Sequence, residues 1–256
     1  MAANLTFLGS GSAFTVGADN FQSNAILTLD NGKKFLIDCG TDIRFSLHAL
    51  GLSHQDITDI YVSHLHSDHV GGLEYVGFTT MFDPTCGKPN LYLSQDIAAD
   101  LWERSLAGGM EAIEGGMTNV DNYFQIHALG PGETFTWEKI TFQLIKLNHV
   151  DTGSMLMPAY GLFFTVNHSQ VFFSNDTKFS YDRLQDYFHR ADIIFHDCEI
   201  SPYPSPVHAH YNELRKLPAA IKAKMWLYGY QPGPLPPALK DGFLGFVKRG
   251  QRFELV

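Results

Sequence analysis

Short apolar runs separated by turn residues recur along the whole chain. They occupy positions 5–8, 25–29, 34–37, 60–63, 90–93, 124–129, 134–137, 140–147, 161–166, 171–174, 193–196 and 224–228. Runs of this length, bounded by turn signals and rich in β-branched and aromatic residues, are typical of strands. The short turns at 30–33 and 167–170 contain asparagine, which predicts that each of them joins two strands as a hairpin.

Longer stretches between these strands predict helices at 43–50, 73–82, 94–106, 181–188 and 209–217. Ser94 is an expected N-cap, because its side chain can accept a hydrogen bond from the first turn of the helix. Strands interleaved with helices are typical of a layered α/β domain. Because 256 residues can bury one sizeable core, we expect a single domain that spans residues 1–256.

The segment 107–122 departs from this periodic pattern. It is polar and is interrupted by two pairs of glycine, each followed by methionine. Such interruptions are typical of a loop. Besides a plain surface loop, two hypotheses are open for this segment: a mobile flap over the functional site, or an oligomer contact.

The charge of the chain argues against a long nucleic acid as a partner. The formal net charge is −9, and lysine and arginine form no dense cluster, whereas nucleic-acid binders usually present a basic face. A small phosphorylated ligand is compatible with this charge, because bound cations would supply the local positive charge.

The sequence shows neither a secretory signal nor a membrane span. No basic stretch precedes an apolar core near the start, and no apolar run approaches the roughly 20 residues that a spanning helix needs. The three cysteines are widely separated and make no disulfide framework. We therefore expect a cytoplasmic protein without a membrane partner.

Four potential metal ligands fall within six residues directly after the apolar run 60–63. They are His64, His66, Asp68 and His69, and the pair Gly71 and Gly72 follows them. Imidazole suits zinc, iron and related ions, and an adjacent carboxylate can hold a second cation. The alternative is a chance cluster of polar residues in a surface loop. The preceding strand and the trailing glycines favour a metal site on a tight loop at a sheet edge.

The pattern His-x-His-x-Asp-His followed by Gly-Gly resembles the signature of the metallo-β-lactamase superfamily. Further segments resemble its ribonuclease Z-like branch, namely 5–13, 35–40, 147–149, 173–177, 193–199 and 207–211. Within that branch the chain looks most like the small phosphodiesterases that hydrolyse cyclic nucleotides, the anti-Pycsar enzymes among them. The resemblance implies an αββα sandwich, in which two mixed sheets lie face to face with helices outside and the metals at one edge.

The resemblance also implies a ligand set for two divalent cations. The first cation would be held by His64, His66 and His149, the second by Asp68 and His69, and both by Asp176. His149 and Asp176 follow apolar strands, as His64 does, which agrees with this assignment. Zinc is the expected metal, with manganese and iron as alternatives. The resemblance further suggests a homodimer.

One histidine that the superfamily usually adds to the second cation is absent. The matching position, after the strand 224–228, is Gly229, which has no side chain. His208 and His210 are the nearest candidates to replace the missing ligand. An alternative hypothesis is a binding protein with an impaired metal site.

Within the resemblance, a histidine of the segment 207–211 donates a proton to the leaving oxygen. His208 and His210 are both candidates for this role, and Asp197 could orient such a ring. Asp68 would bind metal and orient the attacking water. These roles imply hydrolysis of a small phosphodiester, such as a cyclic nucleotide, by metal-activated water.

Two other classes of enzyme are compatible with the superfamily resemblance. Ribonuclease Z-type enzymes process RNA, but they usually carry a gripping arm between the third and fourth ligand motifs, and the interval between His149 and Asp176 is too short for one. Another ester hydrolase, such as a lactonase or a thioesterase, is also compatible, because one fold hosts many chemistries.

Overall fold

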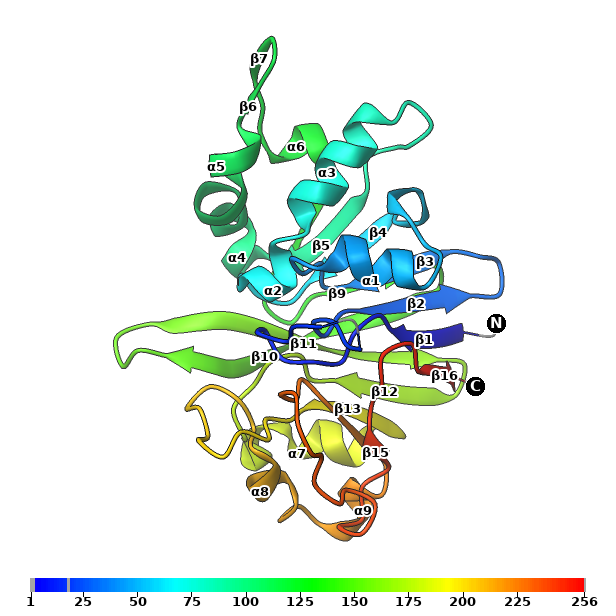
Figure 1. Ribbon diagram of the computed structural model, residues 1–256, viewed down its shortest axis with the longest axis vertical. Coiled ribbons are helices and arrows are strands. Elements are labelled where there is room, and N and C mark those ends of the chain that lie inside the picture. Colours follow the sequence, from blue (N-terminus) through cyan, green and yellow to red (C-terminus); the bar gives the residue numbers. More distant parts are fainter. Residues whose placement is uncertain (1–2, 18, 256) are drawn as a thin grey trace.

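Two seven-stranded sheets pack face to face in the computed structural model, which describes residues 3–17 and 19–255 (Figure 1). In spatial order, the first sheet contains β16 (Arg252–Leu255), β1 (Ala3–Phe7), β2 (Ala25–Leu29), β3 (Lys34–Ile37), β4 (Asp59–Val62), β5 (Asn90–Ser94) and β8 (Gln125–Leu129). The second contains β15 (Gly245–Phe246), β14 (Met225–Tyr228), β13 (Ile193–Asp197), β12 (Ser169–Phe173), β11 (Leu156–Val166), β10 (Ile140–Asp151) and β9 (Thr134–Trp137). Each sheet has parallel and antiparallel pairs, which confirms the predicted pair of mixed sheets.

Helices cover the outer face of each sheet (Figure 1). Beside the first sheet lie α1 (Ile43–Ala49), η1 (His54–Asp56), α2 (Ser67–Val70), α3 (Leu73–Phe82), α4 (Gln95–Asp100), η2 (Leu101–Leu106), α5 (Ala107–Met110) and α6 (Val120–Tyr123). Beside the second lie α7 (Tyr181–Arg190), α8 (Tyr211–Leu214) and α9 (Ala219–Lys222). Within the described part of the chain, no helix is both long enough and apolar enough to span a bilayer. The layers are those of the predicted αββα sandwich.

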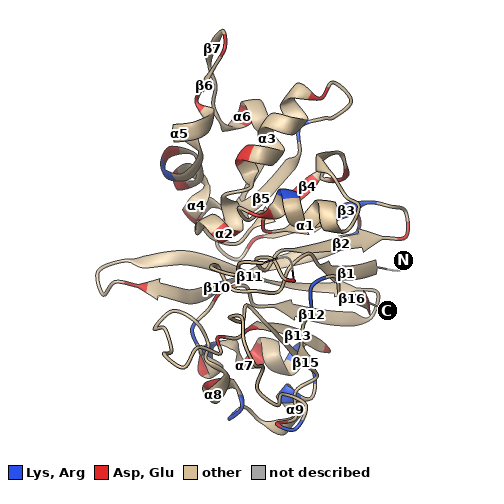
Figure 2. Cartoon of the chain, viewed as in Figure 1, with Lys and Arg blue, Asp and Glu red and all other residues tan. Residues whose placement is uncertain are grey.

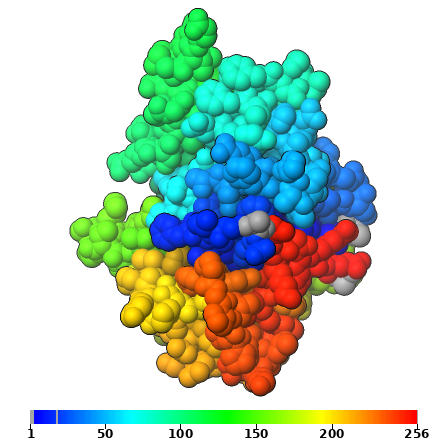
Figure 3. All heavy atoms as spheres, in the orientation of Figure 1, coloured from blue at the N-terminus to red at the C-terminus, as the bar shows by residue number. Residues whose placement is uncertain are grey.

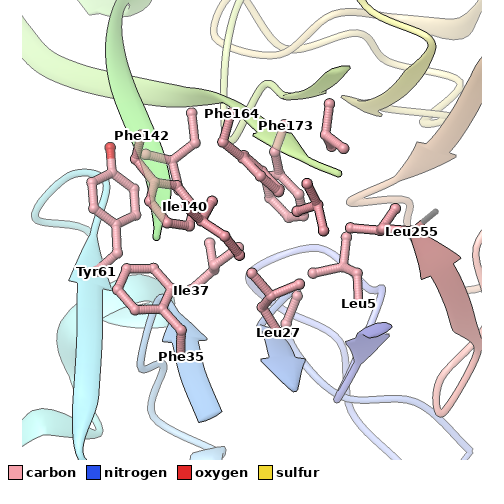
Figure 4. Close-up of a cluster of buried hydrophobic side chains, with 14 of the residues drawn as sticks. Leu5, Leu27, Phe35, Ile37, Tyr61, Ile140, Phe142, Phe164, Phe173 and Leu255 are labelled. Atoms are coloured by element: carbon pink, nitrogen blue, oxygen red, sulfur yellow. The ribbon is translucent and has the colours of Figure 1, made fainter. Parts of the chain in front are cut away.

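The core between the sheets is rich in aromatic side chains (Figure 4). The ring of Phe35 in β3 lies on that of Phe142 in β10, with 5.0 Å between centroids, and Phe142 lies 4.8 Å from Phe164 of β11. Consecutive residues of a strand point to opposite faces. Phe164 therefore enters the central core, while its neighbour Phe163 packs beneath the outer helices.

The strand directions bring several strand ends to one edge. β3, β4 and β5 run parallel to one another, as do β12, β13 and β14. β10 is antiparallel to β11, and β11 is antiparallel to β12, so β10 runs in the same direction as β12. The two sheets are in contact where β4 ends. There the backbone N–H of Tyr160 in β11 donates to the carbonyl oxygen of Ser63, which follows β4, at 3.1 Å. Residues that follow β4, β10, β12, β13 and β14 can therefore form a common site.

Some elements differ from those predicted. The helix expected at 209–217 is the single turn α8, because His210 caps it and the chain turns again before Pro218. The stretch 94–106 divides into α4 and the π-helical turn η2. β10 and β11 extend beyond the predicted strands, since their ends pair with each other outside the central core. The short strands β15 and β16 lie outside every predicted strand.

The segment 107–122 is structured but stands apart from the sheets. It contains α5, a hairpin of β6 (Ala112–Ile113) and β7 (Gly116–Met117), and α6. The hairpin projects from the body of the molecule at the top of Figures 1 and 3, and Met117 is 70% exposed. The flap and oligomer-contact hypotheses for this segment stay predictions.

Shortening this hairpin should leave the stability nearly unchanged. We expect that replacing residues 112–117 by two glycines changes the free energy of unfolding by less than about 0.5 kcal/mol, because the removed side chains are mostly exposed. The N–H of Thr118 already donates to the carbonyl oxygen of Glu111 at 2.8 Å, so a two-residue turn can join them. Chemical denaturation measures the change. A loss above about 2 kcal/mol would contradict the view that the hairpin is an appendage.

Candidate metal centre

Three imidazoles converge where β4 and β10 end. His64 follows β4, His66 immediately precedes α2, and His149 lies in the last part of β10, where its pairing with β11 shifts register. Nδ1 of His66 lies 3.0 Å from Nε2 of His64 and 3.0 Å from Nε2 of His149. Three ring nitrogens therefore face a common point, as the ligands of a cation do.

Hydrogen bonds at the outer nitrogens determine how two of these rings point. Nδ1 of His149 donates to the carbonyl oxygen of Val207 at 2.9 Å, and Nδ1 of His64 lies 3.0 Å from Oγ of Ser63. The Ser63 hydroxyl donates its own proton to Asp38 at 2.8 Å, so it accepts one from His64. Each ring then carries its proton on Nδ1 and turns the lone pair of Nε2 inward, as ligating histidines do.

A second group of donors lies beside the first. Nε2 of His69 is 3.2 Å from Oδ2 of Asp68 and 3.3 Å from Oδ2 of Asp176. Asp68 and His69 belong to α2, whereas Asp176 follows β12. Oδ2 of Asp176 is also 3.9 Å from Nε2 of His64 and 3.8 Å from Nε2 of His149. One carboxylate therefore faces both groups.

Asp38, which lies in the segment 35–40 that carries part of the resemblance, also contacts the site, although no role was expected for it. Its Oδ2 accepts the Nδ1 proton of His69 at 2.7 Å, and its two oxygens accept the backbone N–H and the hydroxyl of Ser63 at 2.8 Å each. Its φ of 62° is unusual for a residue other than glycine. A signal was present in the sequence, since Asp38 follows an apolar strand as His64 and Asp176 do.

His208 lies next to the shared carboxylate, in the loop before α8. Its Nδ1 donates to Oδ2 of Asp197, the last residue of β13, at 2.7 Å and lies 3.9 Å from Oδ2 of Asp176. The backbone N–H of Thr177 donates to the same Asp197 oxygen at 3.1 Å. Asp197 thus holds the His208 ring beside the cluster.

The structure does not bring His210 into this cluster. Its Nε2 donates to the carbonyl oxygen of Ser201 at 3.0 Å, and its Nδ1 accepts the backbone N–H of Asn212 at 3.1 Å. Both nitrogens are therefore engaged at the start of α8. The nearby His196 is buried and donates from Nδ1 to the carbonyl oxygen of Asp197 at 2.7 Å, as a structural residue would.

Gly229 follows β14 in a conformation that suits glycine. Its φ is 78°, in the left-handed region, and a Cβ atom here would lie 2.7 Å from Oδ1 of Asp197. A larger residue at 229 would therefore strain the backbone and displace Asp197.

Burial and charge set the protonation of the cluster. Burial lowers the pKa of His64 well below its usual range and the pKa of His149 to about 4. Burial also opposes the charge of His69, but the carboxylates of Asp176 and Asp68 raise the pKa of this ring well above its usual range. The first group therefore offers neutral nitrogens, whereas the second group is rich in carboxylates that attract a positive charge.

The donors fit divalent metal ions. Among the described residues, three sets that share Asp176 have ligand atoms within 4.8 Å of one another: His64, His66, His149 and Asp176; Asp68, His69 and Asp176; and Asp176, Asp197 and His208. Zinc, iron and manganese accept imidazole nitrogen and carboxylate oxygen in proteins. Two cations that share a carboxylate are suited to the hydrolysis of phosphate esters.

Comparison with known proteins agrees with this geometry. The profile of the family described as "Anti-Pycsar protein Apyc1" matches residues 3–253. The chain is 31% identical to Anti-Pycsar protein Apyc1 of Paenibacillus harenae, over 98% of this chain and 100% of that protein. It is 32% identical to the Anti-Pycsar protein Apyc1 of Bacillus phage vB_BveM-Goe7, over 98% of both.

A solved structure establishes the fold. The metallo-β-lactamase fold protein YhfI from Bacillus subtilis is similar with a TM-score of 0.76, over 99% of both chains and at 16% sequence identity. The fold expected from the sequence is thus confirmed, and the match over 3–253 covers almost the whole chain. The chain has the metallo-β-lactamase fold and belongs to the anti-Pycsar protein Apyc1 family.

Proposed function

We propose that this protein hydrolyses cyclic nucleotides by opening their phosphodiester bond at a centre of two cations. The position of Asp176 carries the proposal, because its Oδ2 lies 3.3 Å from Nε2 of His69 in one donor group and 3.8 Å from Nε2 of His149 in the other. Two cations held side by side suit displacement at phosphorus, where they stabilise the attacking and leaving oxygens. Membership of the Apyc1 family supports a cyclic nucleotide as the substrate.

The proposed ligand assignment follows the two donor groups. We assign His64, His66 and His149 to the first cation, Asp68 and His69 to the second, and Asp176 to both. Bound cations, for which zinc suits the imidazole-rich set best, would lower the pKa of a water molecule and neutralise the phosphoryl oxygens. The side chain of Asp68 is the most exposed of the four carboxylates around the cluster, so it can accept a hydrogen bond from the attacking water.

His208 is the proposed donor of the proton that the leaving oxygen needs. Burial opposes the charge of its ring, but the carboxylates of Asp197 and Asp176 raise its pKa to about 10. Bound cations would lower this pKa again by repulsion, and a protonated ring can then act as general acid near neutral pH. His210 is the weaker candidate, because both of its nitrogens are engaged at the start of α8.

The proposed substrate is small. In the view of Figure 2, lysine and arginine are scattered among acidic residues rather than gathered into a basic stripe, and the net charge is −9. The chain between His149 and Asp176 is taken up by the end of β10, by β11 and by β12, where a ribonuclease Z-type enzyme would usually carry its arm. These features do not favour a long RNA as substrate.

Several finer assignments stay predictions. They are zinc as the metal, a homodimer, a cytoplasmic location, a single domain over residues 1–256, and a functional role for residues 107–122.

One panel of substrates tests the proposed activity. The protein is loaded with zinc or manganese and incubated with cyclic mononucleotides, a transfer-RNA precursor and a lactone, and the products are separated by chromatography. We expect linear mononucleotides from the cyclic nucleotides and no cleavage of the other substrates. Turnover confined to the RNA or to the lactone would assign a different enzyme class, and binding of a cyclic nucleotide without turnover would indicate a binding protein.

A further inference from the structure

The second donor group has fewer protein ligands than the first. Among the residues that the structure describes, four surround the first position, whereas Asp68, His69 and Asp176 are the three donors of the second. Zinc and similar cations usually take at least four ligands, and a cation with few protein ligands is held weakly. A further donor beside the second group would therefore matter for whether two cations stay bound.

Asp197, which lies near the shared carboxylate of Asp176, has one oxygen without a hydrogen-bond partner among the described residues. Its Oδ2 accepts hydrogen bonds from His208 and Thr177, but Oδ1 has no hydrogen-bond partner among the described residues. The side chain is fully buried, where an unpartnered carboxylate oxygen is costly. Ligand atoms of Asp176, Asp197 and His208 lie within 4.8 Å of one another, so Asp197 adjoins the carboxylate that the two groups share.

Because Gly229 has no side chain, there is room beside it for Oδ1 of Asp197. A Cβ atom at 229 would lie 2.7 Å from Oδ1 of Asp197 and at least 3.8 Å from every other atom outside its chain neighbours. A side chain at 229 and the present position of Oδ1 therefore exclude each other. Oδ1 of Asp197 can occupy its present position only because residue 229 has no side chain.

We propose that Asp197 is the fourth protein ligand of the second cation, bound through Oδ1. Oδ2 keeps its hydrogen bond to His208, so one carboxylate serves the cation and positions the proton donor. This inference rests on the proposed two-cation centre. It also explains how the chain can keep a second cation without an imidazole at residue 229.

Cation counts on four proteins test this assignment. Wild type, Asp197→Ala, Gly229→His and the double variant are loaded with zinc and dialysed against metal-free buffer, and the metal per chain is measured by elemental analysis and native mass spectrometry. We expect two cations in wild type and one in Asp197→Ala. The double variant should regain the second, because removal of the carboxylate frees the space beside residue 229 for an imidazole, and histidine tolerates a left-handed φ better than most residues. Gly229→His alone should gain nothing.

Measured rates distinguish the role of Asp197 in binding the cation from its role in positioning the His208 ring. The double variant should recover the cation without recovering the rate of wild type, because its His208 ring stays unpositioned. Asp197→Asn, which keeps the shape of the side chain, guards against misfolding; it should lose the second cation to a chelator about tenfold more readily than wild type. The one cation left in Asp197→Ala would itself show that this variant is folded.

The contrary outcomes are distinct. Two cations retained in Asp197→Ala, or chelator sensitivity of Asp197→Asn equal to that of wild type, would overturn the inference and leave the proposed function intact. One cation in a wild-type protein that hydrolyses cyclic nucleotides would overturn the inference together with the two-cation centre, and would leave only the proposed substrate intact. A wild-type protein that holds no cation and hydrolyses none of these substrates would overturn both.

Discussion

Asp176→Ala should empty both cation positions and abolish hydrolysis of cyclic nucleotides. Oδ2 of Asp176 lies 3.3 Å from Nε2 of His69, 3.8 Å from that of His149 and 3.9 Å from that of His64. The substitution removes one ligand from each proposed cation and also removes the negative charge that lies between them, so that two cations would repel each other. We expect a rate loss of about ten thousandfold or more, equivalent to roughly 5 kcal/mol of barrier.

Elemental analysis and initial rates measure this effect on the same preparations. Asp59→Ala is a matched control, because Asp59 is also buried but lies at the opposite end of β4 from His64 and bonds to Asn90 at 2.9 Å. This control should lose stability but keep its cations. Full cation content in Asp176→Ala would mean that the two positions do not share this carboxylate.

The layers of the fold follow from local pattern more directly than the site does. Successive side chains of β11 and β12 point to opposite faces, so Phe164 and Phe173 enter the central core while Phe163 and Phe172 face the helices, and adjacent aromatic residues in a strand predict that division. The pattern of apolar residues does not predict how far β10 and β11 extend. Their ends pair with each other beyond the core, where burial no longer distinguishes strand from loop.

The residues of the candidate site can also be predicted only in part from the sequence. His64, His149 and Asp176 are recognisable in the sequence because each comes after an apolar run, and the structure brings them together. The choice between His208 and His210 depends on the loop before α8, in which Asp197 reaches one ring while Ser201 and Asn212 engage the other. Such contacts join residues from separate elements, so they cannot be read from sequence spacing.

The contacts of Asp38 and Asp197 with the residues around the proposed ligands also join separate elements, so sequence spacing does not reveal them. Asp38 holds His69 and Ser63, and Asp197 holds His208 and Thr177. Both carboxylates are buried, where a charge needs partners. An aspartate at the end of an apolar strand is therefore a sequence signal for a residue that orients a histidine of the site.

Asp68→Ala should slow hydrolysis of a cyclic nucleotide by about a thousandfold, equivalent to roughly 4 kcal/mol of barrier. Burial opposes the charge on Asp68, but His69, 3.2 Å away, keeps the pKa of this carboxyl below its usual value. The carboxylate is therefore ionised at neutral pH and can both bind a cation and accept a hydrogen bond from water. The variant should keep the first cation, because His64, His66 and His149 do not depend on Asp68 for their contacts.

Initial rates at saturating zinc or manganese, measured together with cation content, test this separation of roles. Ser67→Ala is the matched control, because Ser67 is the exposed neighbour of Asp68 in α2, and it should keep most of the activity. A thousandfold slower Asp68→Ala protein that retains one cation would place the defect in the second position and in the attacking water. Turnover like that of wild type would remove Asp68 from the mechanism, and loss of both cations would show that Asp68 supports the first position as well.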